Sequence, residues 1–481
     1  VMAALFTVSR WMDGLIGDDT NLQDWFSSHT TFVMPCISPD GFDALHQGES
    51  FMRSTLRPAP AGTTRTGLDP QDLDGDGAIR WMRWRDPAGP YVIDPEVPMF
   101  MRPRTLDDSP EDAWFFCDEG LFLNWDGQRW LQAPRKYGLD LNRNFPAHWA
   151  PFSMFGMDGG QFALSAPESR AVVDAFTARD HICAGLTNHT YTGCILTQPY
   201  REDTPLSDLD ILLMERLAED AVKGTDYRVY RTFPDFAYDK KKAVVGVWSD
   251  TMSTVFGVPG YTLELWDPFG FCGVENKKPA EFFVRPCPEK IRELVRKFSE
   301  IPGAVTDWKP FDHPQLGPIE IGGIDYMRTV RNPPVAHLAH ECEKGWLAAD
   351  RLRRSLAEVR VSVESREEGD GLKRLEALLE NLGFLSTAGL KHGEKMPGTA
   401  PVSVRLELDE GVDLVEGALE QNIGHLDGWG TFRPSGVHSV YPGLPDRGHR
   451  GVAHWWLRGR GNVRVIWRGG RGGRGEITVE L

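Results

Sequence analysis

Up to about residue 300, helical hydrophobic spacing alternates along the chain with short apolar runs typical of buried strands. Four segments place apolar side chains three or four positions apart, which predicts helices: 1–17, 165–180, 208–224 and 287–301. Three apolar runs end in polar or turn-forming residues, which predicts buried strands: 30–41, 181–193 and 260–268. Strands separated by helices favour an α/β domain with a largely parallel or mixed sheet. Within this pattern, Ser165 and Glu168 have the spacing of a helix capping box.

The pattern changes after residue 301. Residues 302–335 are rich in Pro and Gly, and a polar helix is expected over 336–357. From 358 onward, short alternating segments separated by Gly and Asp clusters predict a β-sandwich. We therefore expect an α/β domain over 1–301, an extension with one helix over 302–357, and a β-sandwich domain over 358–481.

Composition excludes some classes of partner. The formal net charge of −16 argues against binding to nucleic acid or to an anionic membrane surface. The Gly-rich stretch GRGNVRVIWRGGRGGRGE (459–476) has the alternation of a strand and hairpin, which we favour over an RNA-binding repeat. The chain has no apolar run long enough for a transmembrane helix, and residues 1–17 lack the basic start of a signal peptide. The seven scattered cysteines favour reduced thiols and a cytoplasmic compartment, without establishing the compartment.

Candidate chemistry is concentrated in GLDLNRNFPAHW (138–149). Asp140 and Asn142 alternate with leucines, which predicts a strand that runs into a loop. An arginine between two asparagines, such as Arg143, can bind a carboxylate, because its planar fork matches the two carboxylate oxygens. A turn with one surface salt bridge is the alternative.

Two further residues stand where chemistry is expected. His189 follows a predicted strand and could bind a metal through one ring nitrogen, although a lone histidine in a loop often has no such role. Glu264 lies within an apolar strand, where an unpaired carboxylate is costly. It is either a buried structural ion pair or a general base beside a metal.

Four motifs in order resemble the zinc carboxypeptidase family, the metallopeptidases built like carboxypeptidase A. They are ISPDG (37–41), GLDLNRNFP (138–146), TNHTYTG (187–193) and GYTLELWDP (260–268), and the resemblance covers about 1–300. A bacterial-type subgroup with a C-terminal β domain is also similar. It shares DLDGDGAIRWMR (72–83) and HPQLGPIEIGG (313–323).

The resemblance implies a role for each motif residue. His189 would be the third zinc ligand, and Glu264 the base that takes a proton from zinc-bound water. Asn142 and Arg143 would hold the free C-terminal carboxylate of a peptide. Asp140 would orient a zinc-bound histidine.

Three weaker matches complete the implied site. Arg83 would stabilise the oxyanion, with Arg85 as the alternative. Tyr238 is the candidate for the tyrosine that closes over the substrate, although strict spacing to Glu264 would select Lys242. Ser249 lies where the family's side-chain selector is expected.

The family's first two zinc ligands, His-x-x-Glu, would fall a few residues ahead of Val1, so we expect the given sequence to begin just past them. With them, one Zn²⁺ per complete chain is implied, and the function is a zinc-dependent carboxypeptidase. Its substrate would be a peptide or amide with a free carboxylate. The alternative is a non-catalytic pseudo-peptidase that binds peptide termini, and hydrolysis of another amide or ester beside a carboxylate stays open.

Two motifs mimic metal sites. HLAHECE (337–343) has the ligand spacing of a helix face, but a solvated helix is the simpler interpretation. DLDGDG (72–77) matches the start of a calcium loop, whereas the twelfth position is Arg83 instead of the required Glu. We expect an Asp-rich turn that positions Arg83, with weak calcium binding as the alternative.

Overall fold

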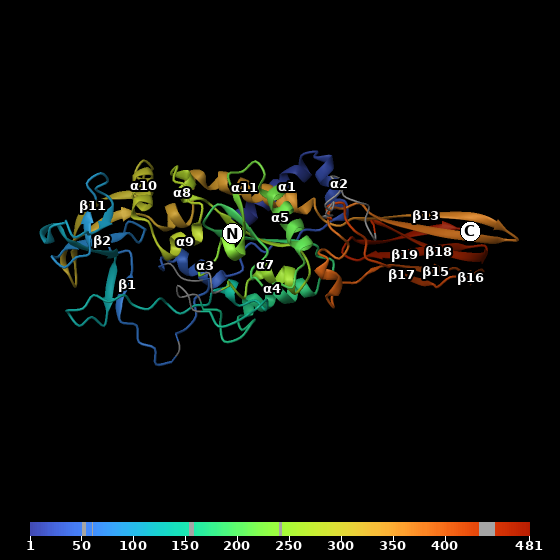
Figure 1. The fold of residues 1–481 in the computed structure, drawn as a ribbon, viewed down its shortest axis with the longest axis horizontal. Coiled ribbons are helices and arrows are strands. Elements are labelled where there is room, and N and C mark those ends of the chain that lie inside the picture. Colours follow the sequence, from blue (N-terminus) through green and yellow to red (C-terminus); the bar gives the residue numbers. More distant parts are fainter. Residues whose placement is uncertain (51–53, 60, 153–157, 240–242, 432–447) are drawn as a thin grey trace, which may run out of the picture.

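Three bodies of secondary structure follow one another along the molecule. The structure is a computed structural model, and it describes residues 1–481 except 51–53, 60, 153–157, 240–242 and 432–447. A six-stranded sheet forms one end, helices surround a four-stranded sheet in the middle, and paired four-stranded sheets form the other end (Figure 1). His189 and Glu264 lie on the middle sheet, whereas Arg83 and Arg85 lie on the six-stranded sheet.

The middle sheet is mixed, and its strands run in the order β7-β10-β8-β9. β10 pairs in parallel with β7 and antiparallel with β8, and β9 pairs in parallel with β8. The strands are β7 (Gly185–Thr190), β8 (Cys194–Thr197), β9 (Arg228–Arg231) and β10 (Gly260–Leu265). The predictions of strands near 181–193 and 260–268 are thereby confirmed.

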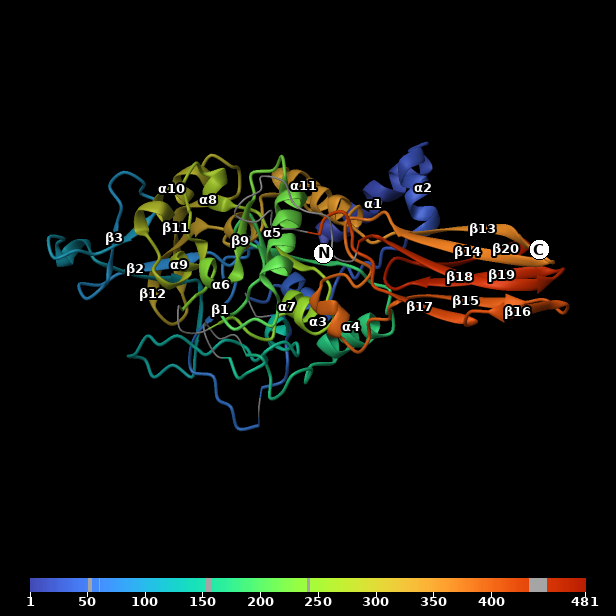
Figure 2. The ribbon, with the colours of Figure 1, turned by 45° about the vertical axis from the view of Figure 1, so that its right-hand side comes forward.

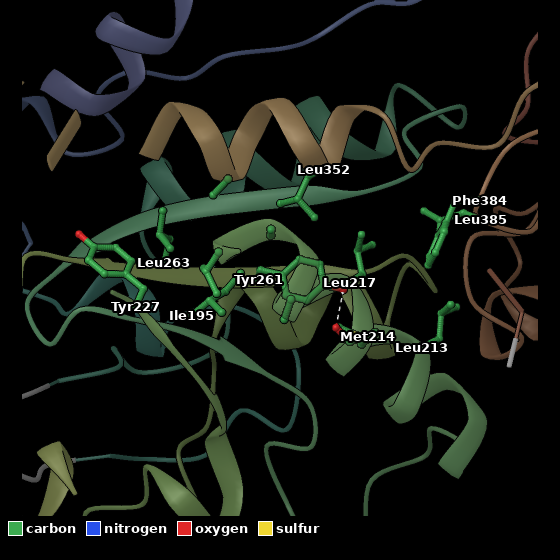
Figure 3. Close-up of a cluster of buried hydrophobic side chains, with 14 of the residues drawn as sticks. Ile195, Leu213, Met214, Leu217, Tyr227, Tyr261, Leu263, Leu352, Phe384 and Leu385 are labelled. Carbon is green, nitrogen blue, oxygen red and sulfur yellow. Dashed lines mark hydrogen bonds between the residues drawn. The ribbon is translucent and has the colours of Figure 1, made fainter. Parts of the chain in front are cut away.

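Helices lie around this sheet and, in the case of α10 (Pro288–Phe298), against the six-stranded sheet, and most lie where hydrophobic spacing predicts them. The main ones are α1 (Met2–Ile16), α4 (Pro167–Thr177), α5 (Asp208–Val222), α7 (Trp248–Thr254), α10 (Pro288–Phe298) and α11 (Val335–Arg353). α5 and α11 bury apolar side chains against β8 and β10, as Figure 3 shows. Within this cluster the Tyr261 hydroxyl donates to the Met214 carbonyl oxygen at 3.0 Å. α1 lies on α11, where the Trp11 indole donates to Asp350 Oδ1 at 3.1 Å.

The six-stranded sheet joins two segments that are far apart in the chain, in the order β11-β12-β2-β5-β3-β4. Its strands are β2 (Trp81–Arg85), β3 (Tyr91–Ile93), β4 (Met101–Pro103), β5 (Trp114–Asp118), β11 (Val305–His313) and β12 (Gly317–Ile324). Beside it, β1 (Gly67–Pro70) pairs with β6 (Gly120–Leu123). Much of the Pro/Gly-rich 302–335 segment is thus a hairpin, which completes the sheet by pairing β12 with β2.

The C-terminal domain is a β-sandwich, as predicted. One sheet has the order β13-β14-β18-β16 and the other β17-β15-β19-β20, and one apolar core lies between them. Its strands are β13 (Val359–Gly369), β14 (Leu372–Asn381), β15 (Val402–Leu408), β16 (Val412–Glu416), β17 (Glu420–Gly424), β18 (Arg450–Gly459), β19 (Asn462–Gly469) and β20 (Arg474–Glu480). The Gly-rich stretch forms the β19–β20 hairpin, as its alternation predicts.

Buried and half-buried side chains alternate along β14, and this alternation gives a prediction for stability. Leu379 is fully buried between the sheets, whereas Leu378 is half-buried on the other face. We expect Leu379→Ala to reduce the free energy of unfolding of this domain by about 2–5 kcal/mol, because it leaves a cavity. Leu378→Ala is the matched control and should cost distinctly less. Chemical denaturation followed by tryptophan fluorescence measures both, and equal losses would contradict the assigned register.

Some local predictions are wrong. Residues 30–38 form no strand and Phe32, Val33 and Met34 are exposed, because no described strand lies beside them to complete a ladder. The PDG turn begins the short helix α3 (Pro39–His46). Ser165 does not cap α4, whose N-cap is Ala166.

Two findings concern the chain as a whole. All seven cysteines are free thiols. Among the helices that the structure describes, none has the length and apolar character needed to cross a membrane.

Candidate active site

His189 and Glu264 lie side by side on adjacent strands. They are register partners in the parallel pairing of β7 with β10, so their side chains project from the same face of the sheet. Glu264 also lies opposite Cys194 of β8, whose thiol is fully buried. Burial raises the pKa of the Cys194 thiol, and the nearby Glu264 carboxylate raises it further.

The Asp140–Asn144 segment forms a tight turn beside these strands. Instead of the predicted strand, a 3₁₀ turn, η2 (Leu141–Arg143), follows Asp140. The reason is local: Asp140 Oδ1 accepts from the Asn142 amide at 3.1 Å, and the Asp140 carbonyl accepts from the Arg143 amide at 2.9 Å. The leucines of the motif are buried below the turn.

A second loop holds this turn in place. Phe145 N donates to the Gly246 carbonyl at 3.0 Å, and Asn142 Oδ1 accepts from Trp248 N at 2.9 Å. Gly246 has φ +65°, and a Cβ there would lie 2.2 Å from the Arg143 carbonyl oxygen. Only glycine allows so close an approach.

The last two polar residues of the motif, Arg143 and Asn144, are both buried and make different contacts. Asn144 is fully buried, and its side-chain oxygen accepts from Ala166 N at 3.0 Å and from Ser169 Oγ at 2.5 Å. It therefore fixes the start of α4. Arg143 is also buried, donates to the Asn142 carbonyl at 2.6 Å, and lies 5.1 Å from the centre of the Phe152 ring.

Electrostatics connect this turn to His189. Burial lowers the pKa of His189 to about 4; Asp140 opposes the shift, and Arg143 and Arg331 add to it. The imidazole is therefore neutral at pH 7 and has a lone pair available for a metal or a proton donor.

Aromatic side chains pack together shortly after His189 in the chain. Tyr191, two residues after His189, is buried, and its ring centre lies 5.7 Å from that of Phe283. The ring of the sequence-predicted Tyr238 lies 6.1 Å from the same phenylalanine. Tyr238 and Tyr191 thus contact the same phenylalanine. Lys242, the alternative for its role, lies outside the described residues.

The extension after residue 301 contributes a cation that the sequence motifs do not indicate. Arg331 ends the short π-helical turn η4 (Met327–Arg331), and its guanidinium lies 5.8 Å from the centre of the Tyr191 ring. The Trp266 indole donates to the Thr329 carbonyl at 2.7 Å and holds this turn against the end of β10. No local spacing signal marks Arg331, because the contact depends on long-range folding.

The proposed selector lies in a buried polar network. Ser249 is fully buried, with its Oγ 2.5 Å from the Tyr200 hydroxyl and 2.8 Å from Thr262 Oγ1. The next residue, Asp250, accepts from Gln198 Nε2 at 2.9 Å and lies 2.9 Å from His148 Nδ1. Ser249 is therefore occupied by neighbours in this structure.

The structure does not bring Arg83 to His189. Arg83 is on β2 in the six-stranded sheet, where its Nε donates to Glu320 Oε2 at 2.7 Å. Its guanidinium lies 4.1 Å from the Trp308 ring centre and 4.8 Å from that of Trp114. Burial lowers the pKa of Arg83, while Glu320 raises it. The alternative Arg85 belongs to the same strand and lies 4.7 Å from the same Trp114 ring.

The HLAHECE motif is part of α11 and has a structural role at its centre. Glu341 is buried, accepts from the Tyr227 hydroxyl and from Trp266 N, and pairs with Lys344 at 2.6 Å. His340 is exposed.

Zinc needs more ligands than His189 offers. Catalytic zinc takes three protein ligands. Within the part of the chain that the structure describes, His189 belongs to no group of three close ligand side chains. The described residues therefore supply one ligand and a neighbouring carboxylate, and they do not complete a zinc site.

Comparisons with known proteins agree with the motifs. Residues 122–293 match the zinc carboxypeptidase family model, and residues 356–480 match a domain of unknown function (DUF8731). No curated protein matches the chain.

Solved structures give only partial similarity. Thrombin activatable fibrinolysis inhibitor is 22% identical over 33% of this chain and 41% of its own, with a TM-score of 0.23. The bovine protein, in complex with tick carboxypeptidase inhibitor, is 23% identical over 33% of this chain and 55% of its own, with a TM-score of 0.24. A β-glucosidase from Streptomyces venezuelae is 12% identical over 26% of this chain and 15% of its own, with a TM-score of 0.13.

The chain thus spans only about half of the first two structures. The family match itself covers His189, Glu264 and the Asp140–Arg143 turn, whereas Arg83 and Arg331 lie outside it. Segment 122–293 of this chain is therefore similar to the zinc carboxypeptidase family.

Proposed function

We propose that the family-matched domain is a carboxypeptidase that removes C-terminal residues from peptides. One observation carries the proposal: Glu264 is the register partner of His189, beside a turn that presents Asn142 and Arg143. A peptide or amide with a free carboxylate is the substrate class, because Arg143 offers a planar fork of donors. Binding the terminus in this way makes the enzyme an exopeptidase.

Each residue has one task in this proposal. Arg143 and Asn142 bind the terminal carboxylate, and Tyr238 covers the bound residue. Glu264 takes the proton of the attacking water and passes it to the leaving amine. Asp140 counteracts the loss of basicity that burial imposes on His189.

A different arginine suits the oxyanion better than Arg83. Arg331 lies over Tyr191 and acts on His189, whereas the Arg83 guanidinium is bound to Glu320 in another sheet. We therefore assign to Arg331 the role of stabilising the negative charge that develops on the scissile carbonyl oxygen. Zinc, bound by His189 and two further ligands, would polarise that carbonyl.

A second candidate function is favoured by the ligand count. Since His189 lacks two close ligand partners among the described residues, a pseudo-peptidase that binds peptide termini without cutting them fits the same geometry. Both functions use Arg143 and Asn142 alike. Zinc content and turnover separate them.

The test uses protein purified from its native source. We expect one zinc per chain by mass spectrometry, and release of the C-terminal amino acid from an N-blocked dipeptide. Chelation should stop the release, and added Zn²⁺ should restore it. Zinc-free protein that binds the dipeptide without cleaving it would establish the pseudo-peptidase instead.

A further inference from the structure

The DLDGDG loop lies against a buried carboxylate from another segment. The loop connects β1 to β2, and Glu119 stands at the junction between β5 and β6. Since β1 pairs with β6 and β2 with β5, the two junctions face each other. Gln71 N donates to the Glu119 carbonyl at 3.0 Å, and Glu119 N donates to the Arg80 carbonyl at 3.0 Å. Glu119 therefore closes the loop at both of its ends.

The Glu119 side chain is buried without a partner. It is 0% exposed, and neither carboxylate oxygen accepts a hydrogen bond. Desolvation raises the pKa of Glu119 to about 8, and the charges of Asp74 and Asp72 contribute to the increase. The amides of Arg80 and Leu73 face the carboxylate and lower the pKa to a smaller extent, without reaching hydrogen-bond geometry. Burying a carboxylate that accepts no hydrogen bond is unfavourable for the free energy of folding, so we expect a positively charged partner to be missing.

Two loop carboxylates converge on the same point. Ligand oxygens of Asp72, Asp74 and Glu119 all lie within 4.8 Å of one another. Asp72 is held in place by the amides of Gly75 at 2.7 Å and Gly77 at 2.9 Å. Both aspartates are exposed, so a cation can enter from solvent.

We propose that Asp72, Asp74 and Glu119 form a Ca²⁺ site in which Glu119 supplies the carboxylate that the loop itself lacks. The loop has aspartates at the first and third positions of a calcium loop and Gly77 at the sixth. Its own twelfth position, Arg83, is bound to Glu320.

Calcium fits this site better than magnesium or zinc. All three side chains offer carboxylate oxygens, which hard cations prefer over softer metals. The loop is of the calcium type, whereas magnesium requires a strict octahedron and keeps most of its waters. Asp76, at the fifth position, bonds to Arg80 Nε at 2.5 Å and so stays outside the cluster.

The site would tie the β1–β2 loop to the β5–β6 junction. β2 is also the strand that receives β12 from the far segment of the chain, so the ion would reinforce the six-stranded sheet. This role is independent of peptide hydrolysis.

Calorimetric titration of the chelator-treated full chain with CaCl₂, in excess MgCl₂, tests the site. We expect one Ca²⁺ per chain with a Kd on the order of 10⁻⁵ to 10⁻³ M. Saturating Ca²⁺ should raise Tm by about 2–4 °C, since it binds only the folded state. Glu119→Gln, which keeps the side-chain shape, should weaken binding at least tenfold and remove the Tm increase.

Two more variants keep the test decisive. Asp74→Asn changes an exposed side chain and should weaken binding similarly, so it carries the test if Glu119→Gln does not fold. Glu111→Gln, an exposed position of the same region, is the matched control and should bind like the native chain. Absence of Ca²⁺ binding in the native chain, unchanged affinity in Glu119→Gln, or equal affinity for Mg²⁺ would overturn the proposal.

Discussion

Glu264→Gln is expected to reduce kcat for an N-blocked dipeptide by about 10² to 10⁴-fold, the usual contribution of a general base. The amide keeps the size of the carboxylate but cannot take a proton from water. Affinity for the dipeptide should change by less than about threefold, because Glu264 is not assigned to substrate binding. Steady-state kinetics gives kcat, and calorimetry with the inactive variant gives the dissociation constant.

The control is Glu275→Gln, which removes an exposed carboxylate whose partner is Lys277. Its kcat should equal that of the native protein. Full turnover by Glu264→Gln would remove Glu264 from the mechanism. Loss of both turnover and binding would instead point to a structural role for the carboxylate on β10.

Much of the α/β part could be predicted from sequence because its signals are local. Hydrophobic spacing predicts α1, α4, α5 and α10 near their observed limits, and the strand motifs predict β7 and β10. The adjacency of His189 and Glu264 is different in kind: it depends on the parallel pairing of two strands, which their own sequences do not encode. The family resemblance supplied that information.

The failures also have physical reasons. Residues 30–38 have the composition of a strand, but a strand needs a neighbour for its backbone hydrogen bonds. Segment 302–335 has the composition of a loop, yet it contains the β11–β12 hairpin, and β12 pairs with β2 from far along the chain.

Long-range placement explains the residues that local patterns missed or misassigned. Arg331 meets Tyr191, and Glu119 approaches Asp72 and Asp74, through such contacts, so no motif marks either residue. Arg83 is the opposite case, because a motif marks it as catalytic, whereas the structure surrounds it with Glu320 and two indole rings.

Arg143→Gln should lower kcat/KM for a substrate with a free C-terminal carboxylate by roughly 30- to 5,000-fold. This range corresponds to about 2–5 kcal/mol, the usual cost of truncating one side of a buried, hydrogen-bonded charge pair. Arg143 is buried, so water cannot replace it effectively. Arg143→Lys should recover only part of the loss, because an ammonium group cannot form the bidentate pair.

A double-mutant cycle identifies what Arg143 binds. The second change is made in the substrate, by amidating its C-terminus. If Arg143 holds the carboxylate, Arg143→Gln should matter little for the amidated peptide, and the two losses should be strongly non-additive. Arg331→Gln is the matched control, since an arginine that acts on the scissile carbonyl should affect both peptides by the same factor. Equal losses from Arg143→Gln on the two peptides would show that this arginine supports the turn instead of the substrate.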